Sequence, residues 1–264
     1  MESFHLFEVL PLWVTFSGIV LLVLSSAWLG IILARRRKKR AKEDDEGPIG
    51  AVVSATLGLL AFILAFTFGL TASRFDSRKQ LLLDEVTAIE TATMQADLIP
   101  EPHRSEVREL LRQYVELRLE AVNNPSSIPK LILKSEDLQR QIWPHASALA
   151  EADLKNADIV SQFVGSVSEM MSLQTRRVTV GSYHIPWMVW VVLFAVTFLS
   201  MIQVGYLFGR SDTINWMFLV GLSLAFSGVM ILIVDLDRSG AGTAGSINVS
   251  QQPLQDLYRR RFGK

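Results

Sequence analysis

Four long runs of apolar residues alternate with polar segments along this chain. They cover residues 10–34, 49–73, 185–208 and 214–234. An α-helix needs about 20 predominantly apolar residues to cross the hydrocarbon core of a bilayer, and each run is long enough. The pattern therefore predicts four membrane-spanning helices, and hence a multi-pass integral membrane protein.

The second apolar run continues into a charged, amphipathic stretch, RFDSRKQLLLDEVTAIETATMQADLI, which starts at Arg74 and contains neither Gly nor Pro. Together the two stretches hold about 50 residues, which at 1.5 Å per residue make a helix roughly 75 Å long. A bilayer core is only about 30 Å thick. We therefore expect span two to continue as one long helix into an extramembrane domain.

Residues 74–183 carry helical periodicity and almost no strand signal. The two prolines of the PEP stretch at 100–102 are expected to end the long helix, and the apolar spacing after them predicts a second amphipathic helix. A shorter helix is expected at 135–143, and Pro144 is expected to start another that runs from 145 toward 177. The predicted fold is all-α, with four spans and a helical extramembrane domain inserted between spans two and three.

The predicted organisation has five parts. These are the first span with its basic loop (1–48), the second span (49–73), the extramembrane domain (74–183), the third and fourth spans (184–234) and a C-terminal tail (235–264). The run RRRKKR after the first span is typical of a cytoplasmic loop, where Lys and Arg are enriched. Basic residues near the spans are almost evenly divided between the two sides, so this run only tips the orientation toward a domain outside the cytoplasm.

Span two has two contrasting faces. Small residues recur every three or four positions on one face, and such residues let helix backbones approach closely in lipid. These helix-packing candidates are Gly50, Ser54, Gly58, Ala61, Ala65 and Gly69. The opposite face becomes more polar toward the extramembrane end, and its residues are the pore-lining candidates Leu60, Ile63, Thr67, Thr71, Arg74 and Arg78.

The polar face has two interpretations. In the first, its aliphatic residues constrict an ion path, its threonines line the path and its arginines form a cationic mouth. In the second, it is an ordinary packing face, with threonines bonded to their own helix and arginines anchored at the membrane interface.

Composition narrows the possible chemistry. The chain has 264 residues with 26 basic and 26 acidic side chains, and a net charge of zero argues against a nucleic-acid binder. The absence of cysteine excludes a thiolate metal site and a cysteine nucleophile. The four histidines lack the spacing of metal ligands, and no pairing of a nucleophile with a base is visible. We therefore predict no enzyme activity, no cofactor and no metal site.

Two stretches resemble the bacterial bestrophin-like family. Residues 74–120 resemble the family's R-x-x-L-V-x-E-A-N-A-I stretch, its L-L-P and its Arg-rich helix with a tyrosine. The segment VDLDRSGAGTAGSINVSQQPLQDL is similar to the family's D-L-D-R-P-x-x-G…I-x-V-S closing motif. Among the matching positions are Glu85, Arg108, Tyr114, Arg176, Asp235, Asp237 and Arg238.

The resemblance implies a homo-oligomeric ion channel, typically for anions, in the inner membrane of a bacterium. Its expected partners are membrane lipids, further copies of the chain and small ions. We expect ions to pass along the polar face of span two while the small-residue face packs against neighbours. The competing hypothesis is a non-conducting membrane scaffold or sensor whose helical domain binds a partner.

Overall fold

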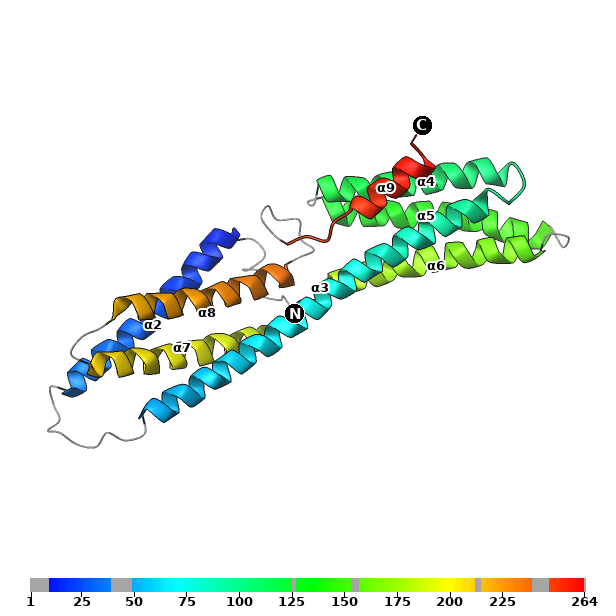
Figure 1. Ribbon diagram of the computed structural model, residues 1–264. Coiled ribbons are helices and arrows are strands. Elements are labelled where there is room, and N and C mark those ends of the chain that lie inside the picture. Colours follow the sequence, from blue (N-terminus) through cyan, green and yellow to red (C-terminus); the bar gives the residue numbers. More distant parts are fainter. Residues whose placement is uncertain are drawn as a thin grey trace. The chain divides into compact units, whose positions relative to one another are not determined.

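A computed structural model of the protein describes residues 10–38, 49–124, 127–152, 157–211, 215–238 and 247–263. Within these ranges the chain is helical and contains no strand, which confirms the predicted all-α fold (Figure 1). The helices are α2 (Leu12–Lys38), α3 (Ile49–Ala96), α4 (His103–Asn123), α5 (Ile128–Ala152), α6 (Ala157–Gly181), α7 (Trp187–Arg210), α8 (Trp216–Asp237) and α9 (Gln252–Arg261).

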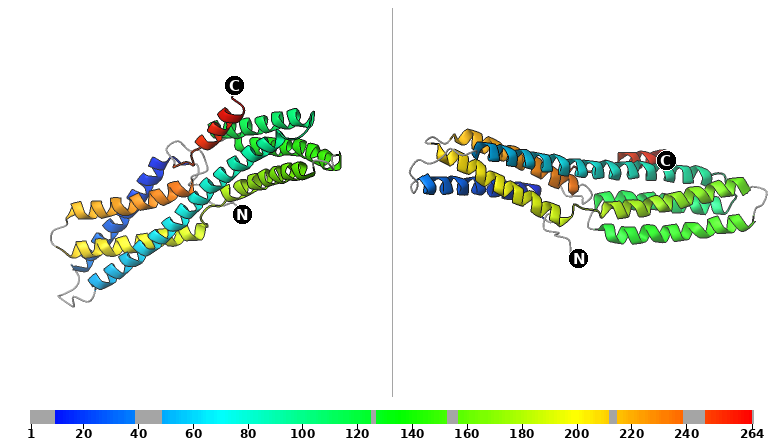
Figure 2. Two further views of the ribbon diagram at one scale, coloured as in Figure 1. Left: turned by 45° about the vertical axis from the view of Figure 1, so that its right-hand side comes forward. Right: turned by 90° about the horizontal axis from the view of Figure 1, so that it is seen from below.

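The helices group into two compact units. The membrane unit contains α2, α7, α8 and the part of α3 up to Phe75, and the helical unit contains the part of α3 from Asp76 together with α4, α5, α6 and α9. Helix α3 is continuous over 48 residues and contributes to both units (Figure 2). The expected long helix is therefore confirmed, and the sequence has no glycine or proline between Gly69 and Pro100 to interrupt it.

Four helices, α2, α3, α7 and α8, are long and apolar enough to cross a membrane. Their most apolar stretches have a mean hydropathy between 2.1 and 2.5, and they coincide with the four predicted spans. The protein is therefore an integral membrane protein. The core of the membrane unit includes the buried side chains Val23, Leu60, Leu193, Met230 and Ile233.

Helices α2 and α7 approach each other so closely that their backbones touch. A Cβ atom added at Gly30 would lie 2.0 Å from the backbone oxygen of Ile202, and one added at Gly205 would lie 1.9 Å from the backbone oxygen of Ala27. No side chain fits at either position. Because lipid tails are as apolar as the helices, contact between spans depends on close packing of this kind.

The helical unit is built around one apolar core. Buried side chains from each of its helices meet there, among them Ile89, Leu111, Ile142, Met170 and Leu257. A hydrogen bond also attaches α9 to α4, because the Tyr258 hydroxyl donates 2.6 Å to Glu116 Oε1. Residues 252–261 thus form a helix that belongs to this unit.

The predicted helix break at Pro144 was wrong. Helix α5 runs from Ile128 to Ala152 with Pro144 inside it, and the next helix begins at Ala157. A proline inside a helix removes one backbone hydrogen bond. The buried stripe of α5 continues on both sides of the proline, through Leu138, Ile142, Ala146 and Leu149. Burial of this amphipathic face stabilises the helix by more than the lost bond costs.

Gly205→Ala should destabilise the membrane unit, because the added Cβ meets the backbone of α2 and forces two helices apart. We expect a loss of about 1–3 kcal/mol, the usual cost of overpacking, seen as a lower unfolding temperature of the detergent-solubilised protein. Gly221→Ala in α8 is the matched control, since no described atom lies within 4 Å of a Cβ added there. Equal unfolding temperatures for the two variants would contradict the close contact between α2 and α7.

Candidate functional site

The pore-lining candidates of span two lie mostly on the side of α3 that faces the interior of the membrane unit. Leu60, Thr67 and Thr71 are buried and Ile63 is partly buried. The Thr67 hydroxyl donates 2.7 Å to the carbonyl of Ile63, and the Thr71 hydroxyl donates 3.1 Å to the carbonyl of Thr67. These are the contacts that the packing interpretation expects, and pore lining by these residues stays a prediction.

The small-residue face of α3 lies on the outside of the single chain. Its six candidate residues, Gly50, Ser54, Gly58, Ala61, Ala65 and Gly69, are all exposed. At the three glycines, no described atom lies within 4 Å of an added Cβ. Beside them runs a second stripe of large exposed side chains, Leu59, Phe62, Phe66 and Leu70. This combined surface, the outward face of α3, is available to lipid or to another protein molecule.

The closing motif binds together three segments at one end of the membrane unit. The Asp237 carboxylate accepts a 3.0 Å hydrogen bond from the backbone N–H of Ile185, just before α7. Arg238 is only 2% exposed and donates 2.8 Å to the carbonyl of Leu10, just before α2. Asp235 accepts a 3.1 Å bond from the backbone N–H of Ile247. The motif therefore fixes where the chain enters and leaves the membrane unit.

The two arginines of the predicted cationic mouth have different environments. Arg74 is at the end of the apolar part of α3, its side chain is 33% exposed, and its Nη1 lies 4.0 Å from Asp237 Oδ1. Arg78, in the helical unit, is buried and donates 2.9 Å to the carbonyl of Tyr183. Arg74 is thus the more exposed of the two arginines.

The helical unit contains a buried charge cluster centred on Glu85. The Glu85 side chain is fully buried, and the Tyr114 hydroxyl donates 2.8 Å to its Oε1. Arg118 donates 3.3 Å to Oε2, and Arg177 forms an ion pair with the same oxygen. The four side chains come from α3, α4 and α6, so one carboxylate joins three helices and neutralises one of two guanidinium charges.

The cluster fixes its own protonation state. Burial raises the pKa of Glu85. The charges of Arg118 and Arg177, with the hydrogen bonds from Arg177 and Tyr114, lower it by a larger amount, so that the pKa lies below its ordinary value of 4.5. Burial, together with the neighbouring Glu85 charge, raises the pKa of Tyr114 well above 10.0. At neutral pH the carboxylate is therefore charged, and the phenol keeps the proton that it donates.

The other family-motif candidates on this unit lie at its surface. Arg108 forms an ion pair with Asp97, and Arg176 is exposed on α6, whereas the adjacent Arg177 reaches Glu85. Sequence reasoning chose Arg176 and missed Arg177. The signal for Arg177 exists, because the buried stripe of α6 passes through Met170, Leu173 and Gln174 and reaches position 177 at the next helical step.

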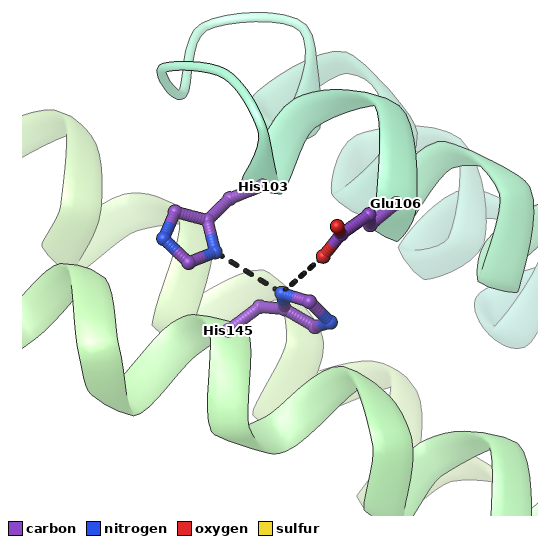
Figure 3. Close-up of side chains that lie close together, drawn as sticks. All are labelled: His103, Glu106 and His145. Carbon is purple, nitrogen blue, oxygen red and sulfur yellow. Dashed lines mark hydrogen bonds and ion pairs between the residues drawn. The ribbon is translucent and has the colours of Figure 1, made fainter.

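The structure also brings together two of the four histidines, for which the sequence spacing gave no indication. His103 on α4 and His145 on α5 lie with their Nδ1 atoms 3.1 Å apart, beside the carboxylate of Glu106 (Figure 3). Two imidazoles and a carboxylate are groups that bind metal ions. Among the described residues, His103, Glu106 and His145 form a group whose ligand atoms are close enough together to bind a metal ion.

The family model described as the bestrophin-like domain matches residues 19–254. The chain belongs to the bestrophin-like family. No curated protein sequence matches it. Within this bestrophin-like chain, the fold brings the motif positions Glu85 and Tyr114 into direct contact, and it groups Asp235, Asp237 and Arg238 at the end of α8.

The bestrophin-like chain is similar in structure to a bacterial bestrophin homologue from Klebsiella pneumoniae. A variant of that homologue with a tyrosine replaced by alanine has a TM-score of 0.69 at 15% identity, over 92% of this chain and 96% of that one. A variant with a tryptophan replaced by alanine has a TM-score of 0.71 at 14% identity, over 94% and 96%. A structure obtained by Zn-SAD phasing has a TM-score of 0.65 at 14% identity, over 92% and 95%. The fold is therefore shared along almost the whole of both chains.

Glu85→Gln should destabilise the helical unit, because it leaves the buried Arg118 and Arg177 without a countercharge. We expect a loss of about 3–5 kcal/mol, as for other broken buried ion pairs, measured as a lower thermal unfolding temperature. In the wild type the pKa of Glu85 is lowered, so its contribution is complete above pH 4.5 and is lost as the pH falls below that value. The variant should lack this part of the acid destabilisation.

Glu120→Gln is the matched control for this prediction, since Glu120 is exposed on α4. It should unfold at the wild-type temperature and keep the wild-type loss of stability in acid. If Glu85→Gln and Glu120→Gln unfolded alike at neutral pH, the buried cluster would not have the stabilising role given to it here.

Proposed function

We propose that this bestrophin-like protein is an oligomeric channel for small ions, preferably anions, in the bacterial inner membrane, with α3 as the wall of the pore. Conduction, not catalysis, is the proposed activity. The observation that carries the proposal is the unequal burial of the spans. In the most apolar stretch of α3, 17% of the residues are buried within the single chain. In the corresponding stretches of α2, α7 and α8 the share of buried residues is 33%.

The outward face of α3 suits contact with further copies of the chain. Small residues such as Gly58, Ala61 and Ala65 allow close approach of helix backbones, and they stand beside Phe62 and Phe66, which are 68% and 61% exposed. When copies assemble around a closed rotation axis, each contributes one α3. Such a ring encloses a path bounded by α3 helices.

Two parts of α3 can line an ion path, and they imply different channels. A path on the oligomer axis is lined by residues that are exposed in the single chain, that is, by the outward face. The predicted lining by Leu60, Thr67 and Thr71 requires a path through each subunit, because these side chains face the interior of the membrane unit. The burial supports the axial path, with large apolar side chains as its constriction.

The preference for anions rests on family membership and on Arg74. The family resemblance implies anion conduction, and the Arg74 side chain is 33% exposed at the end of the spanning part of α3. A ring of such charges, one from each copy, attracts anions to the mouth of the path. Arg78 contributes less to this attraction because it is buried and bonded to the Tyr183 carbonyl.

Variants with one introduced cysteine distinguish the two paths. The chain contains no cysteine of its own, so a thiol reagent modifies only the introduced residue. Ala65→Cys lies on the outward face of α3 and Thr67→Cys on the inward face, two residues apart. We expect a negatively charged thiol reagent to reduce ion flux into liposomes for Ala65→Cys and to leave Thr67→Cys unchanged. The unsubstituted protein, which the reagent cannot modify, controls for other effects.

Block at Thr67→Cys alone would contradict the axial path and support the path through each subunit. No flux from folded, oligomeric wild-type protein in several salts would contradict conduction altogether. The scaffold hypothesis, in which the helical unit binds a partner, would then take its place.

Arg74→Glu should shift selectivity away from anions. A unit charge at 4 Å is worth about 1 kcal/mol in water, with opposite signs for an anion and a cation, so each unit of charge changed at the mouth should alter the anion-to-cation permeability ratio roughly 30-fold. Reversal potentials in a salt gradient measure this ratio. Arg176→Glu reverses an exposed charge on α6 and is the control. The same ratio in wild type and Arg74→Glu would contradict a cationic mouth at Arg74.

A further inference from the structure

Two helices of the helical unit bring together the side chains of His103, Glu106 and His145. The Nδ1 atoms of the two histidines are 3.1 Å apart, and Glu106 Oε2 lies 3.4 Å from His145 Nδ1. One ligand atom from each of the three residues lies within 4.8 Å of the other two. The close-up shows the three groups directed toward one another across the gap between α4 and α5 (Figure 3).

The helical hairpin explains why residues so far apart in sequence meet. Helices α4 and α5 are joined by a short connection, so the first turn of α4 lies beside the later turns of α5. His103 and Glu106 are three residues apart and therefore share a face of α4. His145 follows Pro144 in α5 and faces them.

A hydrogen bond between the two Nδ1 atoms uses one N–H and one lone pair, and so leaves no second N–H there for the Glu106 carboxylate. A neutral imidazole carries a proton on one of its two nitrogens. If His145 Nδ1 carries it, that single N–H is shared between His103 Nδ1 and the Glu106 carboxylate. If His103 Nδ1 carries it instead, the lone pair of His145 Nδ1 faces a carboxylate. A cation between the three atoms accepts all three lone pairs at once.

The spacing matches metal coordination. Zn²⁺ binds imidazole nitrogen and carboxylate oxygen at roughly 2.0–2.1 Å, so two ligand atoms of a tetrahedral site are separated by about 3.3 Å. The two observed separations, 3.1 and 3.4 Å, lie on either side of that value. Rotation of the Glu106 side chain, which is 54% exposed, brings its carboxylate to the remaining edge of the tetrahedron.

We propose that His103, Glu106 and His145 form a binding site for a divalent transition-metal ion, with Zn²⁺ as its best match. Two imidazoles and one carboxylate favour Zn²⁺, Co²⁺ or Ni²⁺ over Mg²⁺ and Ca²⁺, which take oxygen ligands. The ion joins the first turn of α4 to the later turns of α5.

The fourth coordination position faces solvent. Glu106 and His145 line an open surface groove of about 700 Å³, together with Leu110, Arg140, Gln141 and Pro144. Glu109 also borders this groove, but its carboxylate accepts hydrogen bonds from Arg112 and Gln113. Water from the groove therefore completes the coordination. This inference does not rest on ion conduction, and either can fail without the other.

Metal titration of the purified, untagged full-length protein tests the site. After treatment with a chelator, the protein should bind one Co²⁺ per chain, with the visible absorption of a nitrogen- and oxygen-coordinated ion, and Zn²⁺ should displace it. His145→Ala and Glu106→Gln should each weaken binding, His145→Ala by roughly 100-fold or more, because loss of even an outer-shell partner of a metal ligand costs about 10–100-fold. His184→Ala, in the membrane unit, should bind Co²⁺ as the wild type does.

Two results would overturn the proposal. One is the absence of Co²⁺ and Zn²⁺ binding by the folded wild-type protein. The other is wild-type affinity in the double variant His103→Ala and His145→Ala, which would assign the ion to other ligands. Circular dichroism and gel filtration verify that each variant is folded, and none of the three site residues belongs to the apolar core of the helical unit.

Discussion

The unbroken helix α3 is the constraint on which the rest of the structure depends. Inside a bilayer no water is present to bond backbone N–H and C=O groups that lose their helical partners, so the span must remain helical. The same helix continues to Ala96. Its first part supplies Leu60 and Thr67 to the interior of the membrane unit, and its second part supplies Glu85 and Ile89 to the interior of the helical unit. A portion of one element therefore contributes to the core of each unit.

Buried charges in both units hold chain segments together, which limits what else they can do. The Glu85 carboxylate is bonded to Tyr114, Arg118 and Arg177. The Asp237 carboxylate accepts a hydrogen bond from the backbone N–H just before α7. A carboxylate so engaged is a poor acid, base or ion ligand, because any new partner must displace existing bonds. Two surfaces that carry none of these buried charges are the outward face of α3 and the groove beside His145.

The sequence predicted the four spans, the all-α fold and the long helix because apolar length and helical period determine them locally. It could not say which face of span two turns inward. In lipid, hydrophobicity does not separate a side chain that faces the protein from one that faces the bilayer, so Leu60 and Leu59 look equivalent in sequence but only Leu60 is buried. His103 and His145 were missed because a helical hairpin, not sequence spacing, brings them together. Pro144 was misinterpreted because the burial of a whole helix face outweighs one lost hydrogen bond.

The outward face of α3 carries both of the shapes that helix packing requires. One stripe, Gly58, Ala61, Ala65 and Gly69, forms shallow hollows, and the adjacent stripe, Leu59, Phe62, Phe66 and Leu70, repeats at the same intervals one residue later. Because the stripes are offset around the helix, a projecting side chain on one copy faces a hollow on the next when the copies are related by rotation. Such a contact can repeat around a closed ring of copies. A face built only of leucines would pack equally well against lipid, whereas alternating stripes of small and large residues pack best against a second helix of the same kind.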